Sequence, residues 1–254
     1  MKKSVTLIAL LWIVTLATAA PPSPVDLLMI AADNELLQPF INRLENPQIE
    51  QHKAWTIWTG SLAGKSVALT RSEGDPLNAV AATTLAIRLH APRLIFVYGL
   101  ARPHDRSLHA GDLVLSERFV AFDGMVSPQK PLGAGSDPLT WQKLPHLLMT
   151  EGENEVPAES FPADKGALAL AQRLAQGKRP FRTGVLGSAP QINREADRIA
   201  WVHDQWKTST EDGESADIAG CAALFHVPVF GARIVGDSPK EIVAFASEFL
   251  NAWK

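Results

Sequence analysis

Residues 214–237 constrain the fold of this chain most, because they read as a helix, a tight turn and a buried strand in succession. Apolar residues recur at three- and four-residue spacing from Ile218 to Phe225, which places an apolar stripe on one face of a helix. The turn falls at His226-Val-Pro228. Residues 227–235 form a short apolar run rich in β-branched residues, which is typical of a strand covered on both faces. The segment therefore predicts a buried strand preceded by a helix.

Two carboxylates lie at the ends of this unit, Glu214 where the helix opens and Asp237 where the strand ends. Burying an unpaired charge is costly, so a carboxylate at the end of a buried strand is rarely there for packing. Asp237 could instead cap a final helix, because Asp-Ser-Pro is a good capping sequence. Glu214 could instead interact favourably with the dipole of its helix, although Glu211 and Asp212 are equally suited to that role. We interpret the pair as a candidate functional site.

The rest of the chain alternates between strands and helices, which favours an α/β fold with a sheet covered by helices. A hairpin is expected between the second and third strands, and residues 124–162, rich in Gly, Pro and acidic residues, are expected to be irregular. The expected strands are 25–31, 54–60, 65–71, 94–99, 112–118, 183–187 and 227–235. The expected helices are 34–44, 76–89, 164–175, 194–203, one that opens at Glu214, and 239–253.

The first 19 residues are typical of a secretory signal. Lys2 and Lys3 supply a positive start, residues 5–16 an apolar stretch, and Ala17-Thr-Ala19 a small-residue cleavage site. The apolar stretch is too short for a membrane span. We therefore expect a signal peptide at 1–19, one domain at 20–254, a periplasmic or secreted location, and no membrane association after cleavage.

Charge and composition exclude several classes of partner. Removal of Lys2 and Lys3 reduces the 24 Lys and Arg residues to 22, against 27 Asp and Glu, and no basic face is evident. Nucleic acid is therefore not an expected partner. The histidines show no metal-ligand spacing, so we expect neither a metal ion nor a cofactor.

Several motifs then follow one another along the chain. They are Thr59-Gly-Ser-Leu-Ala-Gly64, Ser72-Glu-Gly-Asp-Pro-Leu-Asn-Ala79, Ala110-Gly-Asp-Leu-Val-Leu115, Gly213-Glu-Ser-Ala216, His226-Val-Pro228 and Arg233-Ile-Val-Gly-Asp237. In this order they resemble the nucleoside phosphorylase/nucleosidase superfamily, above all its methylthioadenosine/S-adenosylhomocysteine nucleosidases. The resemblance covers nearly all of residues 20–254. It implies one α/β domain with a mixed, twisted central sheet flanked by helices.

The resemblance also implies cleavage of the N-glycosidic bond of a purine nucleoside or a related N-riboside. The matching aspartate of the family protonates the leaving base, which implies that role for Asp237. An aspartate can do so near neutral pH when burial raises its pKa, and we expect Asp237 to be buried. Glu214 matches the glutamate that accepts hydrogen bonds from the 2′- and 3′-hydroxyls of the ribose. Arg233, in the same motif as Asp237, is expected to bind substrate.

The nucleophile distinguishes hydrolysis from phosphorolysis. Hydrolytic members orient water with a glutamate in the first strand–helix loop, where this chain has Glu35, although Glu35 is also simply a first-turn helical residue. Phosphorolytic members bring arginines to the oxyanion, and Arg102 is the candidate here, while Ser72 could donate to either nucleophile. The N-terminal Gly-Asp-Pro-x-Arg loop of many phosphorylases is absent. Hydrolysis is therefore preferred, with phosphate as the alternative co-substrate.

The expected base pocket departs from the family. Gln191-Ile192 stands where the nucleosidases carry a stacking Phe-Ile pair, Gly213 replaces a methionine and Gly236 replaces a Ser or Thr. These changes favour a rival interpretation, a nucleoside-binding or storage protein that has lost catalysis. Family members commonly dimerise, so a homodimer is also possible.

Overall fold

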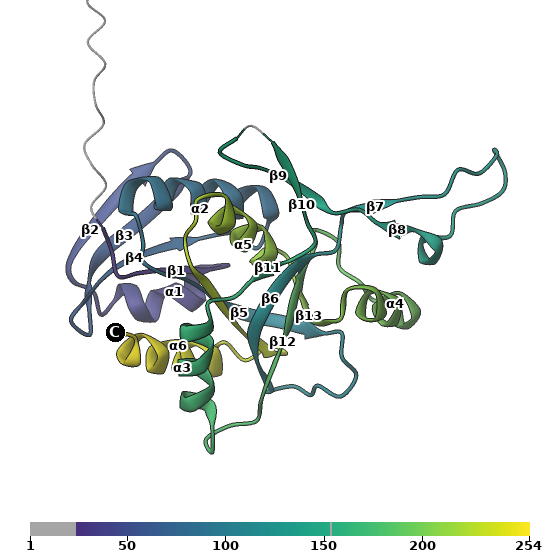
Figure 1. Cartoon of the computed structure of the whole chain (residues 1–254). Coiled ribbons are helices and arrows are strands. Elements are labelled where there is room, and N and C mark those ends of the chain that lie inside the picture. Colours follow the sequence, from purple (N-terminus) through teal and green to yellow (C-terminus); the bar gives the residue numbers. More distant parts are fainter. Residues whose placement is uncertain (1–23, 153) are drawn as a thin grey trace, which may run out of the picture.

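The computed structural model describes residues 24–152 and 154–254, and the expected signal peptide at 1–19 lies outside the described residues (Figure 1). The fold is a mixed α/β domain, as the sequence predicts. The strands are β1 (Leu27–Ala31), β2 (Glu45–His52), β3 (Trp55–Leu62), β4 (Lys65–Arg71), β5 (Ile95–Pro103), β6 (Leu113–Ala121), β7 (Met125–Val126), β8 (Gln142–Lys143), β9 (His146–Met149), β10 (Glu155–Ala158), β11 (Phe161–Pro162), β12 (Phe181–Ser188), β13 (Thr208–Asp212) and β14 (Val229–Val235).

The α-helices begin near the residues that the sequence indicates. Asp75 caps α2 and Asp164 caps α3 with their side chains, as expected of aspartate before a helix. The helices are α1 (Asn34–Ile41), α2 (Pro76–His90), α3 (Lys165–Ala175), α4 (Ala196–Trp206), α5 (Ser215–Leu224) and α6 (Pro239–Ala252), with a short 3-10 turn, η1, at Pro138–Thr140.

The main sheet has the order β11-β6-β12-β13-β5-β1-β4-β3-β2, and β14 pairs with both β5 and β6. These pairings close β5, β14, β6, β12 and β13 into a ring, because β13 also pairs with β5. Strands β1, β4, β5 and β14 run parallel to one another, so their carboxyl ends meet at one edge. That edge is where ligands bind in open α/β sheets.

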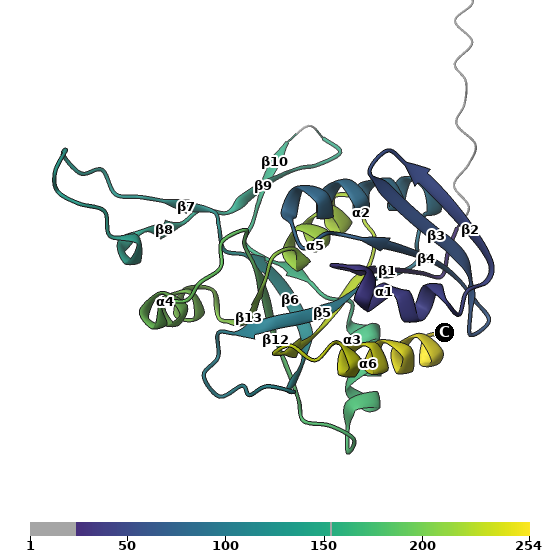
Figure 2. The same ribbon diagram turned by 180° about the vertical axis from the view of Figure 1, so that it is seen from behind.

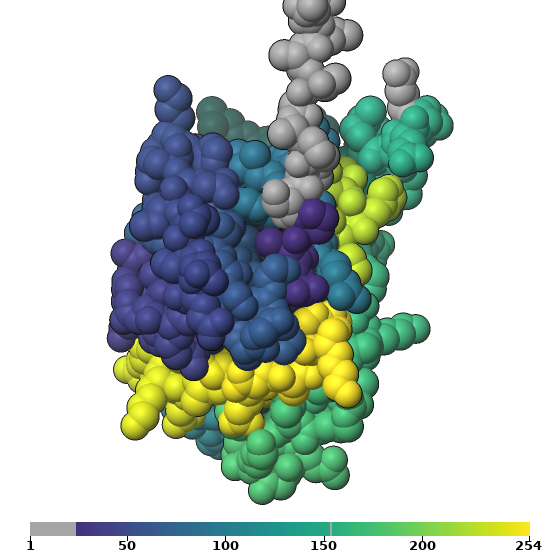
Figure 3. Space-filling view, turned by 90° about the vertical axis from the view of Figure 1, so that its left-hand side faces the viewer, coloured from purple at the N-terminus to yellow at the C-terminus, as the bar shows by residue number. Residues whose placement is uncertain are grey.

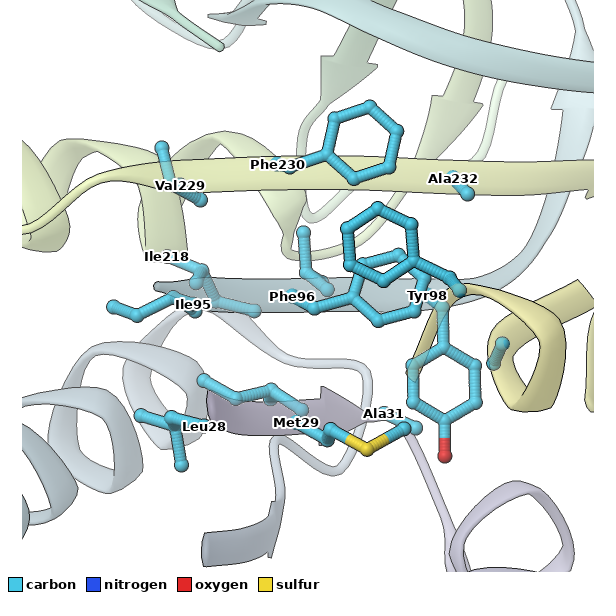
Figure 4. Close-up of a cluster of buried hydrophobic side chains, with 14 of the residues drawn as sticks. Leu28, Met29, Ala31, Ile95, Phe96, Tyr98, Ile218, Val229, Phe230 and Ala232 are labelled. Carbon is cyan, nitrogen blue, oxygen red and sulfur yellow. The ribbon is translucent and has the colours of Figure 1, made fainter. Parts of the chain in front are cut away.

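Helices cover both faces of the sheet, as alternating strands and helices predict. Helices α2 and α5 pack together on one face, and α1, α3 and α6 lie on the other (Figures 1 and 2). The two faces bury an apolar core in which Phe96 of β5 stacks on Tyr98 and on Phe230 of β14 (Figure 4). The expected buried strand at 227–235 is confirmed, since every residue of β14 is buried.

The main sheet contains two strands of five or more residues, β2 and β13, that were not expected from the sequence. Strand β2 is polar and mostly exposed, and it forms the outer edge of the sheet beside β3, in the region that Figure 3 shows above the C-terminal helix α6. Strand β13 has the polar sequence Thr-Ser-Thr-Glu-Asp, which lacks the apolar residues by which a buried strand is predicted. Its burial is possible because Thr208, Glu211 and Asp212 are hydrogen-bonded at or beside the site described below.

The expectation that residues 124–162 are irregular is wrong in part. The segment forms two small hairpins, β7–β8 and β9–β10, which extend from the body of the domain (Figure 1). Each is a separate two-stranded sheet of short strands, so neither shows the sustained alternation by which strands are recognised.

In the part of the chain that the structure describes, no helix is long and apolar enough to cross a membrane.

Candidate functional site

A cleft of about 730 Å³ opens at the carboxyl ends of the parallel strands. Its walls come from the ends of β5, β13 and β14 and from the loops after β1 and β4. Four of its lining residues are carboxylates, whereas Arg102 is its one lining cation among the described residues. The lining residues are Ala32, Gly74, Leu100, Ala101, Arg102, Pro103, Ala110, Glu211, Asp212, Gly213, Glu214, Val235, Gly236 and Asp237.

Glu214 lies at the inner wall of the cleft, bound by two buried partners. Oγ of Ser72 donates a short hydrogen bond to Oε2 of Glu214, and Nη2 of Arg233 lies 3.4 Å from Oε1. Ser72 and Arg233 are fully buried, and Glu214 is 3% exposed. The structure therefore brings together three of the residues that the sequence indicates, and it fixes the Glu214 carboxylate in one orientation.

Asp212 is the centre of this network, and its role was not predicted from the sequence. Its Oδ1 accepts the backbone N–H groups of Glu214 and Ser215, each at 2.8 Å, and the hydroxyl of Ser188 at 2.8 Å. Its Oδ2 accepts Nε of Arg233 at 2.9 Å and Oγ of Ser215 at 2.7 Å. Asp212 thus holds both the start of α5 and the guanidinium that faces Glu214.

The two neighbouring carboxylates are perturbed in opposite directions. Burial raises the pKa of Asp212, but the charge of Arg233 and several hydrogen-bond donors outweigh it and bring the pKa below the ordinary value. Burial raises the pKa of Glu214 above its ordinary value even though Arg233 and Ser72 oppose the shift, and the charge of Asp212 adds to the rise. The site therefore places one firmly ionised carboxylate beside one that ionises reluctantly.

Two glycines allow close contacts at the site, Gly213 with the backbone of Gly74 and Gly99 with the side chain of Arg233. A Cβ at Gly213 would collide with the carbonyl oxygen of Gly74, so the family's methionine does not fit this backbone without a shift. A Cβ at Gly99 would lie 2.8 Å from Nη1 of Arg233. Glycine suits both positions because these neighbouring atoms leave no room for a side chain.

Asp237 lines the cleft, but it is not buried as expected. Gly236 and Asp237 are exposed just beyond the end of β14. The strand ends at Val235, and the chain turns through Gly236, at φ 104°, towards α6. The N-cap of α6 is Ser238, with no side-chain capping bond, so the structure assigns no capping role to Asp237.

Glu35 does not reach the cleft, so its expected position is wrong. Helix α1 begins at Asn34, and its period turns Leu36, Leu37 and Phe40 into the core. Glu35 is exposed on the outer side of the first turn. Leu36 fills the inward position beside Gly99 instead, and it carries no group that could orient water.

Gln191 and Ile192 also lie outside the cleft lining. Gln191 is half-buried and Ile192 is 53% exposed, so the expected base-stacking position is not formed by these side chains. The next residue, Asn193, is buried and donates its backbone N–H to Oε1 of Glu211 at 3.1 Å. The segment contacts the site through Asn193, whose role was not predicted from the sequence.

Arg102 lines the cleft at the end of β5. It is paired in the sheet with Glu211, and its Nη1 lies 3.4 Å from Oε1 of that carboxylate. Its side chain is 54% exposed. Glu211 is buried and is also bound by His104, whose Nε2 lies 3.0 Å from Oε2. Burial raises the pKa of Glu211, but hydrogen bonds from His104 and Asn193 outweigh it and bring the pKa below the ordinary value.

Within the described residues, no group of three or more His, Cys, Asp or Glu side chains is arranged to hold a metal ion. The cleft itself presents four carboxylates and one guanidinium. A polar ligand with hydroxyl groups would meet acceptors at the Glu214 end, and an exposed carboxylate, Asp237, lies within the same cleft.

Comparison with known proteins agrees with this architecture. The model of the family described as the phosphorylase superfamily matches residues 26–252. The 5′-methylthioadenosine/S-adenosylhomocysteine nucleosidase of Aeromonas salmonicida is 27% identical over 199 residues, 77% of this chain and 79% of that protein.

Solved structures share the fold at lower identity. The nucleosidase of the same name from S. pneumoniae, solved with a transition-state inhibitor, superposes with a TM-score of 0.73 and 18% identity, over 90% of this chain and 99% of that one. A futalosine hydrolase mutant from Helicobacter pylori superposes with a TM-score of 0.71 and 19% identity, over 89% of this chain and 97% of that one.

Proposed function

The chain belongs to the phosphorylase superfamily, and we propose that it hydrolyses the N-glycosidic bond of a purine nucleoside or a related N-riboside. The similar proteins from Aeromonas salmonicida and Helicobacter pylori are named as a nucleosidase and a hydrolase. The observation that carries the proposal is the buried Glu214 carboxylate, fixed by Ser72 and by the Arg233–Asp212 pair at the wall of an open cleft.

In this proposal Glu214 binds the sugar. A carboxylate accepts hydrogen bonds from two neighbouring hydroxyls, which suits the 2′- and 3′-hydroxyls of a ribose. Arg233 and Asp212 are positioning residues, because their contacts in the structure are to protein groups. These contacts hold Glu214 in place before substrate arrives, so binding does not have to order it.

Asp237 is the proposed general acid. It is exposed in the cleft that also holds Glu214, so a bound base can reach its carboxyl group, and in this proposal the base also covers that group and supplies the burial that favours its protonated form. Protonating the purine at N7 lets the base leave as a neutral molecule while the C1′–N9 bond breaks. The electron pair of that bond goes to the base, water attacks C1′ of the sugar, and the proton that this water loses goes to solvent, from which Asp237 is protonated again.

Water is preferred to phosphate as the nucleophile because the cleft is lined mainly by negative charge. The four lining carboxylates, Glu211, Asp212, Glu214 and Asp237, outnumber the two guanidinium groups that pair with them, those of Arg102 and the buried Arg233. At ~4 Å and an effective dielectric of ~20, like charges cost about 4 kcal/mol per pair. Arg102, the candidate for phosphate, is itself paired with Glu211. Phosphorolysis is therefore the second candidate, and it depends on Arg102.

The sugar-binding role predicts a clear effect of Glu214→Gln. Loss of a charge-assisted hydrogen bond of about 1.5–3 kcal/mol corresponds to a fall of about 10- to 100-fold in kcat/KM for nucleoside cleavage. The matched control is Glu35→Gln, which changes an exposed carboxylate outside the cleft and should leave kcat/KM within about twofold. Steady-state rates of base release measure both. If the two substitutions changed kcat/KM equally, Glu214 would not be the sugar-binding residue.

The same variant has an expected effect on stability. Because the pKa of Glu214 is raised in the folded protein, the stability it contributes is present at acidic pH and is lost as the pH rises through that pKa. Glutamine stays neutral and avoids this loss. The melting temperature of Glu214→Gln relative to wild type should therefore increase with pH.

We also propose that the protein is exported, on the strength of the N-terminal sequence described above. N-terminal sequencing of the mature protein should begin at Ala20, and an intact Met1 on exported protein would contradict this.

A homodimer is part of the proposal as well. Val80 of α2, 42% exposed, and Leu224 of α5, 46% exposed, line a common hollow together with Phe225. Exposed apolar patches of this kind mark interaction sites. Sedimentation of the purified protein would measure the association.

A further inference from the structure

A second pocket, which we call the basic pocket, lies outside the cleft. Its volume is about 210 Å³, and its walls come from β6, from the segment that runs from β8 to β10, and from the end of α4 (Figure 1). It shares no lining residue with the cleft. Its lining residues are Arg118, Val120, Ala121, Lys143, Leu144, Pro145, His146, Ala158, Glu159, Ser160, Gln205, Trp206 and Lys207.

The charge of this lining is the reverse of that of the cleft. Three side chains with permanent positive charge, Arg118, Lys143 and Lys207, face one carboxylate, Glu159. The chain as a whole carries a net charge of −3, so this gathering of cations runs against its overall balance. Like charges held together repel one another, and an anion placed between them relieves that repulsion.

Arg118 enters the pocket from an irregular point of the sheet. Ser116 of β6 pairs with Gly184 of β12, and Arg118 pairs with Val185, so Glu117 is an extra residue in the ladder. Such bulges change the direction of a side chain and are frequent beside functional sites. The ion-pair partner of Arg118 among the described residues is Glu117, 4.0 Å from its Nε, and this pair is partly exposed and therefore weak. The guanidinium thus keeps donors for a ligand.

Two further donors belong to the hairpins. Nζ of Lys143 donates to the carbonyl oxygen of Gln205 at 2.9 Å and lies 5.8 Å from the ring centre of Trp206, so the ammonium group is held at the pocket with two of its three donors left. Nε2 of His146 is buried and has no hydrogen-bond partner among the described residues. A buried polar atom without a partner is costly, and a ligand oxygen in the pocket would supply one.

We propose that the basic pocket binds a small oxyanion with two negative charges, either inorganic phosphate or the phosphate group of a monoester. Three cations against one carboxylate leave two positive charges, which match a dianion. The planar fork of an arginine such as Arg118 pairs with two phosphate oxygens at once. Pockets for drug-sized ligands have volumes of about 300–1,000 Å³, so this smaller pocket suits a single anionic group.

This site is distinct from the place where the proposed reaction occurs. Lys207 lies just before β13, whereas Glu211 and Asp212 are at the far end of that strand. At a rise of about 3.3 Å per residue, Lys207 and Glu211 are separated by roughly 13 Å along the strand. Phosphate in the basic pocket is therefore not a co-substrate in the cleft, and the inference does not depend on the proposed function.

The test is calorimetric titration of the purified protein with inorganic phosphate, at an ionic strength kept constant with chloride. Wild type should bind one phosphate per chain. Arg118→Met and Lys207→Met should each lower the affinity by about 10- to 100-fold, because each removes a charge-assisted hydrogen bond. Arg106→Met, which removes the same charge from an exposed turn after β5, is the matched control and should leave the affinity within about twofold. Methyl phosphate should bind with similar affinity if the pocket accepts monoesters, and only inorganic phosphate should bind if it takes the free ion.

A thermal measurement checks the same site independently. Phosphate should raise the melting temperature of wild type, because a ligand that binds only the folded state stabilises it, and should not raise that of Arg118→Met. Should Arg118→Met fail to fold, Lys207→Met, at an exposed position, carries the test. No saturable binding of either phosphate compound, or an affinity unchanged in both variants, would overturn the inference. So would phosphate binding that Arg102→Met abolishes, because the anion would then lie in the cleft.

Discussion

Replacing Asp237 by asparagine is expected to lower kcat for nucleoside cleavage by about 10²- to 10⁴-fold, the usual contribution of a general acid. Asparagine keeps the size of the side chain but has no proton to give to N7, so the base must leave as an anion. Asp237 is exposed and has no capping role, because α6 is capped at Ser238 without a side-chain bond. The free energy of unfolding of the variant should therefore lie within about 0.5 kcal/mol of the wild-type value, as is usual for surface substitutions.

Glu241→Gln is the control for Asp237→Asn. Glu241 is an exposed carboxylate in the first turn of α6, four residues further along the chain, and it does not line the cleft. Its substitution should leave kcat unchanged. If Asp237→Asn retains kcat within a few-fold of wild type, the general acid is another group and the proposed mechanism is wrong.

Asp212→Asn is expected to destabilise the folded protein by about 3–5 kcal/mol, as removal of one partner of a buried ion pair does. The buried guanidinium of Arg233 would keep only Glu214, whose pKa is already raised by burial. Asparagine offers one acceptor oxygen in place of two, so its NH₂ group would face either the donors on Oδ1 or those on Oδ2. Denaturation by urea measures the loss.

The pH dependence of this loss follows from the lowered pKa of Asp212. Its contribution to stability is present above the ordinary carboxylate pKa and is lost as the pH falls through the lower pKa of the folded protein. The difference between wild type and Asp212→Asn should therefore shrink in acid. Asp105→Asn, at a partly exposed turn, is the control and should cost far less. A loss below about 1 kcal/mol for Asp212→Asn would show that the network is not essential to the fold.

The elements with strong periodicity or clear end residues were predictable from the sequence. The buried strand β14, the hairpin of β3 and β4, and helix α2 with proline at its start all occur where they are expected. The missed strands have the opposite character. Strand β2 is a polar edge strand, and β13 is a polar strand buried by hydrogen bonds that only the tertiary structure provides.

The candidate site was predictable where its residues follow the apolar strands. Ser72, Glu214 and Arg233 come together because they lie at or near the ends of elements that meet at one edge of the sheet, and Asp237 lines the same cleft as Glu214. Glu35 was misplaced because a single residue of helical register decides whether the first turn of α1 points Glu35 or Leu36 inward. Asp212, Glu211, His104 and Asn193 bind mainly protein groups, and such partners cannot be recognised in one sequence without the fold.

The identity of the sugar released in phosphate buffer tests the central claim most directly. Wild-type protein is incubated with inosine and inorganic phosphate, and the products are identified by mass spectrometry. Hydrolysis at the Glu214 and Asp237 cleft predicts free base and free ribose in equal amounts, at a rate that added phosphate does not change. Ribose 1-phosphate as the product, or intact nucleoside from inosine and from every other purine nucleoside offered, would contradict it.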